Sequence, residues 1–195
     1  MRTLIAGLTF VATAALAATV GQPAPEFTLN DVAGKPVKLS DYRGKYVVLE
    51  WVNPECPYVE KHYGSANMQG LQKEYTAKDV AWLTINSTNA GHYEYYPPQR
   101  MAGWMKQMNG APSATLLDPA GTVGRAYGAR TTPHMYIVDP QGRLVYAGGI
   151  DDKRSTNPAD VKTAKNYVRA AMGEVLAGKS ISAASTQPYG CSIKY

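Results

Sequence analysis

Two continuous apolar runs dominate the hydrophobic pattern of the chain. They are residues 46–52, YVVLEWV, and residues 80–86, VAWLTIN. Runs that are apolar at nearly every position are typical of strands buried on both faces of a parallel sheet. A shorter run at residues 114–117 predicts a third strand, because an Asp-Pro-Ala-Gly turn follows it directly. These runs predict the centre of a sheet.

Apolar residues spaced three or four positions apart predict the helices. One apolar face runs from Val59 to Tyr75, a second helix spans about 99–108, and a short one spans 123–127. A final helix is expected from an N-cap at Asn157 to a glycine stop at Gly178. Strands and helices therefore alternate through most of the chain.

Two antiparallel pairs complete the predicted sheet. Residues 26–31 alternate apolar and polar and turn back through Gly-Lys-Pro into residues 37–40, which predicts an N-terminal hairpin. Residues 134–139 and 143–149 are joined by an Asp-Pro-Gln-Gly turn. The fold class expected is α/β, with a mixed central sheet flanked by helices and an N-terminal hairpin extension.

Residues 1–18 have the pattern of a secretory signal peptide. A short positive start precedes an apolar, alanine-rich stretch and a small-x-small cleavage pattern, so cleavage is expected near Ala17 or Ala18. The chain is then expected to be secreted or periplasmic, with no membrane segment after cleavage. The remainder divides into a domain at residues 19–178 and a C-terminal tail at residues 179–195.

Charge and composition exclude some classes of protein and leave others open. The formal net charge is +5, but Lys and Arg are scattered, so no basic stripe indicates a nucleic-acid partner. No cofactor is expected. The oligomeric state is not indicated by the sequence.

The two cysteines are the main candidates for chemistry. Cys56 lies between the strand at residues 46–52 and the helix after it, with Pro57 suited to the first helical position. Unpaired N–H groups and the helix dipole favour thiolate there, and thiolate is the reactive form of cysteine. Cys191 lies in the tail, which either is a disordered end or docks on the domain. A static Cys56–Cys191 bridge, a resolving role for Cys191 and an intermolecular bridge all stay open.

Several motifs together resemble the redoxin branch of the thioredoxin fold, which includes the AhpC/TSA proteins. They are residues 21–29, GQPAPEFTL, residues 39–45, LSDYRGK, and Thr132-Pro133. The resemblance covers about residues 19–177. It is strongest to the peroxiredoxin-like group that has a lone N-terminal cysteine and a Gly-Cys-Ser-Ile-Lys ending.

The resemblance implies a thioredoxin-like fold and a set of site residues. Thr132 and Pro133 would form a cis-proline corner facing Cys56, where a partner segment can add as a short strand. His134 would lower the thiol pKa as a cation or relay a proton, unless strand alternation turns it away. Cys56, Cys191 and these three residues are thus the predicted catalytic set. The implied partner is a thiol or disulfide protein, or a small-molecule peroxide.

The chain also departs from its relatives at the site. Val59 stands where a Cys-x-x-Cys motif has its second cysteine, and Leu49 and Asn53 stand where a peroxiredoxin has Pro and Thr/Ser. The main hypothesis is an exported thiol oxidoreductase acting through Cys56. A redox-inactive binding module with a structural Cys56–Cys191 disulfide is the alternative. A copper-binding protein is a minority alternative.

Overall fold

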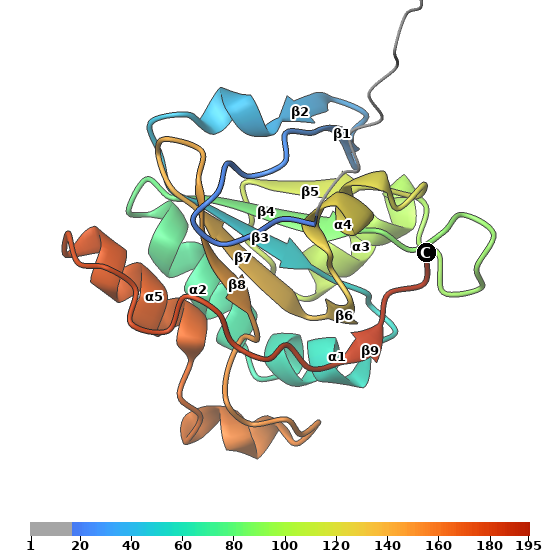
Figure 1. The fold of residues 1–195 in the computed structure, drawn as a ribbon. Helices are drawn as coiled ribbons and strands as arrows, with labels where there is room; N and C mark the ends of the chain where they lie inside the picture. The colour runs from blue at the N-terminus through green and yellow to red at the C-terminus, as the bar shows by residue number, and fades with distance from the viewer. Residues whose placement is uncertain (1–16) are drawn as a thin grey trace, which may run out of the picture.

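A seven-stranded sheet forms the centre of the computed structural model, which describes residues 17–195 (Figure 1). All but the last two residues of the predicted signal peptide lie outside that range. The strand order is β2-β1-β5-β4-β3-β7-β8. The strands are β1 (Thr28–Asp31), β2 (Pro36–Lys38), β3 (Val47–Trp51), β4 (Ala81–Asn86), β5 (Ala114–Leu117), β7 (His134–Val138) and β8 (Leu144–Gly148).

The sheet is mixed, as the sequence predicted. β3 and β4 pair in parallel from Val47↔Ala81 to Trp51↔Ile85, and β4 pairs in parallel with β5. β7 pairs antiparallel with both β3 and β8, and β1 pairs antiparallel with β2 and β5. Every residue of β3, β4 and β7 is buried, because both faces of the sheet are covered.

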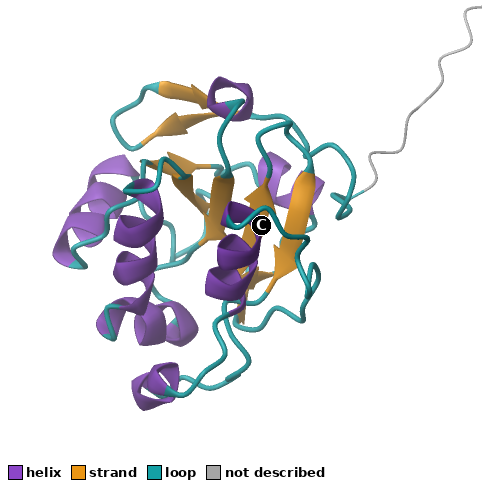
Figure 2. Cartoon of the chain, turned by 90° about the vertical axis from the view of Figure 1, so that its left-hand side faces the viewer, coloured by secondary structure: helices purple, strands orange, loops and turns teal. Residues whose placement is uncertain are grey.

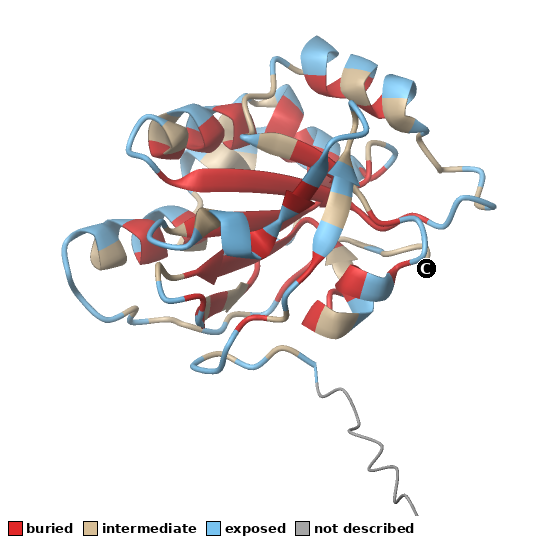
Figure 3. Cartoon of the chain, turned by 90° about the horizontal axis from the view of Figure 1, so that it is seen from above, coloured by how far each residue is buried: buried red, intermediate tan, exposed pale blue. Residues whose placement is uncertain are grey.

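Helices cover the two faces of the sheet unequally (Figures 2 and 3). α1 (Pro57–Gly64), α2 (Asn67–Thr76), α3 (Pro98–Gln107) and α5 (Tyr167–Leu176) contribute to one buried cluster. α4 (Thr122–Tyr127) and the N-terminal hairpin contribute to the other, together with the 3₁₀ helix η1 (Leu39–Tyr42). None of the helices in residues 17–195 has the length and hydrophobicity that a membrane span requires.

Two predicted helices are each divided in the structure. The helix after Cys56 ends at Gly64 and restarts at Asn67, with Ala66 between them in the left-handed region at φ 58°. The predicted helix from Asn157 to Gly178 is wrong in its first half, which is a 3₁₀ helix, η2 (Pro158–Lys162), followed by α5.

The break before α5 has a local cause. Lys165 N donates to Asp152 Oδ1 and Asp152 N to Lys165 O, so this backbone pairs with a neighbouring loop. Asn157 does cap η2, and Asn166 caps α5 by accepting a hydrogen bond from Arg169 N.

The C-terminal tail is ordered and returns across the molecule. Its early part follows the free edge of β8, where Ala147 N donates to Ala184 O and Thr186 N donates to Ala147 O. It then forms β9 (Cys191–Ser192), which pairs antiparallel with β6 (Thr131–Thr132). In Figure 1 the tail is the red segment that reaches β9 between α1 and β6. The tail therefore docks on the domain and covers an otherwise open sheet edge.

Candidate active site

Cys56 lies at the N-cap of α1, directly after the central strand β3. Its carbonyl accepts the hydrogen bonds of Val59 N and Glu60 N at 2.9 Å, and Pro57 takes the first helical position. The residue is 1% exposed. Its Sγ donates to the carbonyl oxygen of Thr132 at 3.0 Å. The sulfur therefore lies at a helix start, as predicted, but it is shielded from solvent.

The Thr132–Pro133 peptide bond faces the sulfur and is cis, as the resemblance implies. Thr132 is buried, and its Oγ1 has no hydrogen-bond partner among residues 17–195. This corner connects β6 to β7, so the central sheet holds it in place. Thr132 thus presents its carbonyl to Cys56 from the opposite side of the site.

His134 lies on the other face of the sheet. Its Nδ1 accepts from Arg130 N and lies 3.2 Å from Tyr136 Oη, and its ring packs against that of Tyr136. Tyr136 belongs to the buried cluster on the α4 side, whereas Cys56 belongs to the cluster on the α1 side. Burial, with a further effect of Arg130, lowers the pKa of His134 to about 3. His134 is therefore neutral at physiological pH and is not brought to the sulfur.

Cys191 is brought to Cys56 by the tail. In the pairing of β6 with β9, Cys191 is the register partner of Thr132, the same residue that accepts the hydrogen bond of Cys56. Burial first, and then the hydrogen bond and charge of Cys56, raise the pKa of the Cys191 thiol to about 12. Both cysteines are free thiols in this structure. The Cys191 thiol is therefore protonated at neutral pH.

Polar and aromatic residues form a rim on one side of the two cysteines. Asn53 Nδ2 donates to Glu94 Oε2 at 2.6 Å. Tyr96 Oη donates to Glu55 Oε1 at 2.7 Å, and the guanidinium of Arg100 lies 3.6 Å above the ring of Tyr96. The tyrosine-rich loop is therefore tied to the start of α1. Asn53 stands where a peroxiredoxin has Thr or Ser, and its side-chain amide is hydrogen-bonded to the carboxylate of Glu94.

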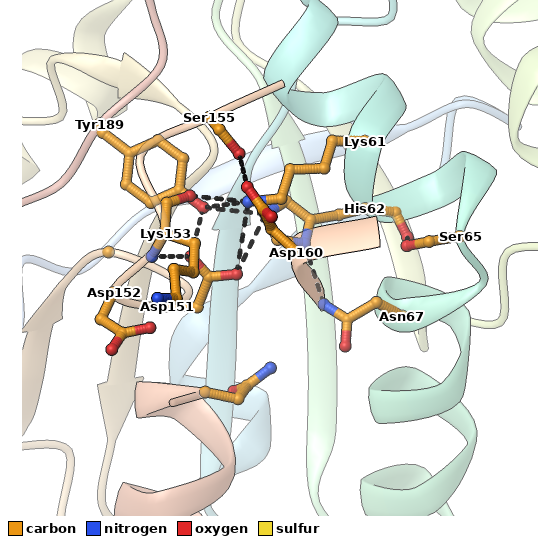
Figure 4. A network of polar contacts seen from close by, with 12 residues as sticks. Lys61, His62, Ser65, Asn67, Asp151, Asp152, Lys153, Ser155, Asp160 and Tyr189 are labelled. Atoms are coloured by element: carbon orange, nitrogen blue, oxygen red, sulfur yellow. Dashed lines mark hydrogen bonds and ion pairs between the residues drawn. The ribbon is translucent and has the colours of Figure 1, made fainter. Parts of the chain in front are cut away.

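A buried polar cluster holds the tail beside α1 (Figure 4). Tyr189 Oη donates to Asp151 Oδ1 at 2.5 Å and lies 3.1 Å from His62 Nε2 and 3.3 Å from Lys61 Nζ. Lys61 Nζ lies 3.6 Å from Asp151 Oδ2 and also donates to the carbonyl of Lys153. We call Lys61, His62, Asp151 and Tyr189 the tail cluster.

No local pattern in the sequence predicts the tail cluster. Lys61 and His62 lie off the apolar stripe of α1, a position that predicts solvent exposure, yet both side chains are fully buried. Burial, with a further effect of Lys61, lowers the pKa of His62 to about 3, so this histidine is neutral. Local pattern does not predict this burial, because the residues that bury Lys61 and His62 are Asp151 and Tyr189, which are distant in the sequence.

A second buried carboxylate lies deeper on the same side of the sheet. Glu50 accepts hydrogen bonds from Tyr63 Oη at 2.8 Å and Trp82 Nε1 at 2.8 Å. Gln72 Nε2 and Thr84 Oγ1 donate to it at 3.1 and 3.2 Å. Burial raises the pKa of Glu50, and these four donors only partly offset that effect. We call Glu50 and its donors the core cluster.

Residues 17–195 contain no group of three or more His, Cys, Asp and Glu side chains arranged to hold a metal ion. His134 faces away from Cys56, and His92 Nδ1 accepts from Glu94 N in the rim loop. The copper hypothesis therefore finds no ligand set in this part of the chain.

Comparison with known proteins finds relatives in both sequence and structure. Thiol-disulfide oxidoreductase ResA of Geobacillus thermodenitrificans is 28% identical over 135 residues, which cover 66% of this chain and 68% of that protein. The crystal structure of an uncharacterized conserved protein from Geobacillus kaustophilus has a TM-score of 0.79 and 29% identity, covering 91% of this chain and 92% of that one.

The thioredoxin-like fold is confirmed by a further structure. The thioredoxin domain of a thiol-disulfide oxidoreductase from Bacteroides vulgatus has a TM-score of 0.54 at 20% identity, covering 75% of this chain and 98% of that chain. The similarity to thiol-disulfide oxidoreductases supports the prediction of an oxidoreductase. Residues 20–147 match the AhpC/TSA family over well over half of the chain. The chain therefore belongs to the AhpC/TSA family.

Proposed function

We propose that this protein is an exported thiol–disulfide oxidoreductase in which Cys56 is the nucleophile and Cys191 the resolving cysteine. The observation that carries the proposal is that both cysteines meet at Thr132. Cys56 donates to the carbonyl of Thr132, and Cys191 pairs with the same residue from the tail. The N-terminal signal pattern supports export, with a domain at residues 19–178 and a functional tail at residues 179–195.

The reaction proceeds in two exchange steps. The Cys56 thiolate attacks one sulfur of a partner disulfide, forms a mixed disulfide, and releases the other partner sulfur as a thiolate. The Cys191 thiolate then attacks the sulfur of Cys56 and releases the second partner thiolate. The partner disulfide gains two electrons, and Cys56 and Cys191 lose two on forming their own disulfide. An external dithiol reverses this oxidation.

The order of attack follows from the pKa of Cys191. Burial is the largest cause of the upward shift in that pKa, and a further part comes from the neighbouring Cys56. That further part disappears once Cys56 is bound in a mixed disulfide, because a disulfide sulfur neither donates a hydrogen bond nor carries a charge. Cys191 then loses its proton more readily, so it attacks after Cys56 and not before.

The other predicted site residues have supporting roles in this proposal. Thr132 and Pro133 form the wall against which the two sulfurs meet. His134 acts as a positioning residue, since its Nδ1 holds Arg130 N and thereby the backbone that leads into β6. It exchanges no proton with Cys56, from which the sheet separates it.

Disulfide exchange is favoured over peroxide reduction by one contact. Asn53, at the position where a peroxiredoxin has its hydroxyl, donates to Glu94, so its amide is already engaged and does not offer a free hydrogen bond to a peroxide. Catalytic consumption of added hydrogen peroxide with a thiol donor would reverse this preference.

The reduction potential of the Cys56–Cys191 pair tests the proposal. A potential between about −120 and −230 mV, in the range of exchange enzymes, is expected when the pair is equilibrated with graded thiol buffers. A bridge that persists below about −300 mV would indicate a structural disulfide and the redox-inactive binding module instead. Cys56→Ser should abolish disulfide reduction, whereas Cys191→Ser should accumulate the mixed disulfide.

A further inference from the structure

We infer that β9 occupies the place of a partner's strand, so that an extended, cysteine-bearing segment of a partner protein binds along β6 only when β9 lifts away. This inference rests on the proposed function and adds to it the regulation of the site by the chain's own tail, which covers the docking surface. The surface is the edge of β6 together with the covered sulfur of Cys56.

The pairing of β6 with β9 has the geometry of a bound peptide strand. Cys191 and Ser192 pair antiparallel with Thr132 and Thr131 through the main chain. A main-chain contact of this kind places no demand on most side chains, so another extended segment can make it equally well. The one side chain that the register aims at the reactive sulfur is a cysteine. The tail thus already places a cysteine where an exchange partner would have to place one.

The tail is also what separates Cys56 from outside molecules. Cys56 is 1% exposed, and Cys191 packs against the buried cluster that contains it. Tyr58, at the start of α1, packs edge-on against the ring of Tyr189, with centroids 5.7 Å apart. A partner sulfur therefore reaches Cys56 only if the segment around β9 moves.

Gly190 defines the kind of segment that fits. It has φ +140°, and a Cβ placed on it would lie 2.0 Å from the carbonyl oxygen of Thr132. That oxygen belongs to the backbone and accepts the hydrogen bond of Cys56, so it cannot move aside cheaply. The partner segment is accordingly expected to carry glycine directly before its cysteine.

Contacts on both sides of β9 hold the tail while this short segment lifts. Upstream, Tyr189 is fixed in the tail cluster. Downstream, Ile193 N donates to Arg130 O at 3.1 Å, and Lys194 O accepts from Asn89 N at 2.7 Å. β9 itself spans only two residues, so lifting it away from β6 breaks few main-chain contacts.

The rate of Cys56 alkylation by iodoacetamide tests the inference in the full chain. All measurements use the Cys191→Ser background, so that Cys56 is the one thiol present. Adding Gly190→Ala should raise the rate by about tenfold, because the new Cβ forces β9 away from β6. Gly173→Ala is the matched control and should change nothing, because its Cβ would meet no atom within 4 Å.

A synthetic peptide tests the partner class directly. The peptide has the sequence of residues 187–195 with serine in place of the cysteine. It should slow the alkylation of the Gly190→Ala variant again, and the same peptide with alanine in place of its glycine should not. Tyr189→Phe gives a second variant, which keeps the ring, loosens the tail cluster and should raise the rate less than Gly190→Ala.

The outcomes separate this inference from the proposed function. Equal alkylation rates with and without Gly190→Ala, or no protection by the peptide, would overturn the docking surface even if disulfide exchange is observed. A raised rate together with peptide protection, in a chain that exchanges no disulfides, would retain the docking surface and refute only the oxidoreductase. A raised rate together with peptide protection and exchange supports both.

Discussion

The core cluster and the tail cluster each bury a carboxylate on the same side of the sheet, and α1 contributes to both. Glu50 is surrounded by uncharged donors from β4, α1 and α2. Asp151 faces a buried lysine, a neutral histidine and a tyrosine from the distant tail. The core cluster therefore ties together elements that the sheet already places side by side, whereas the tail cluster joins α1 and the chain after β8 to a segment that is distant in sequence.

The difference shows how one helix can serve stability and function at once. Tyr63 on α1 faces inward to Glu50, while Lys61 and His62 face Asp151 and Tyr189. Since Cys56 begins this helix and Cys191 lies two residues after Tyr189, the tail cluster sets the approach of the two cysteines. Loss of the core cluster should lower the stability of the whole fold. Loss of the tail cluster should also loosen the attachment of the tail to the domain.

The largest effect is expected from Asp151→Asn. It leaves the buried Lys61 without its counter-charge, which should lower the free energy of unfolding by about 3–5 kcal/mol in denaturant titrations. Asp79→Asn is the control, since Asp79 pairs with Lys45 at the surface and should cost at most about 1 kcal/mol. Similar losses for the two variants would mean that the buried pair contributes no more to the free energy of unfolding than a surface pair does.

Tyr63→Phe and Tyr189→Phe make the same change in each of the two clusters. Each removes one hydroxyl from a buried carboxylate and should cost about 1–3 kcal/mol in the stability of the region it holds. Hydrogen exchange should locate the loss across the sheet for Tyr63→Phe and in residues 179–195 for Tyr189→Phe. If both variants affect the same amides, the two clusters form one cooperative unit.

Acid should act on the tail cluster through His62. A histidine whose folded pKa lies below its unfolded value binds fewer protons when folded, so stability is lost as pH falls through the window from about 6.5 to about 3. At pH 5.5 the loss should be about 1.4 kcal/mol relative to pH 8. His62→Gln should remove that part of the pH dependence, measured by denaturant unfolding at both pH values.

His134 offers the matched case on the other face of the sheet. Its pKa is lowered in the same way, so His134→Gln should remove a loss of similar size. The two variants differ in location: His62→Gln should alter hydrogen exchange around Tyr189, and His134→Gln should alter it around Arg130 and β6. An unchanged pH dependence in both variants would show that the histidines are not held neutral.

The smallest effect is expected from Glu50→Gln at neutral pH. A carboxylate whose folded pKa is raised contributes its stability below the ordinary value and loses it as pH rises through the raised value. The amide oxygen can keep the three donors of Oε2, and the amide nitrogen can donate to Tyr63 Oη, so Glu50→Gln should be at least as stable as the original chain at pH 7. At pH 4 the two should be equal. Lower stability of Glu50→Gln at pH 7 would show that the carboxylate is needed in its charged form.

Most strands and the position of Cys56 followed from local pattern. The runs at residues 46–52, 80–86 and 114–117 are strands because a fully apolar segment has to be covered on both faces. Cys56 lies at a helix start because a proline follows it and an apolar stripe continues from there. These features depend on neighbours within a few residues, which the sequence records directly.

The final helix and the histidines depended on contacts that local pattern does not record. Asp152 captures the backbone of Lys165, so the continuous helix predicted there is broken. His134 had two possible faces, and the register of β7 against β3 decided between them. His62 lies off the apolar stripe of its helix, where it could be a surface or a packing residue, and Asp151 and the tail bury it.

Periodicity and motifs encode the α/β fold with its mixed sheet, the family, and the sulfur at the start of α1, because each depends on residues close together in the chain. The docking of the tail, the meeting of Cys191 with Cys56 at Thr132, and the burial of Lys61 and His62 with Asp151 and Tyr189 arise only in the folded molecule. A buried charge is tolerated when a partner satisfies it, and here the path of the chain in space brings that partner from a distant part of the sequence.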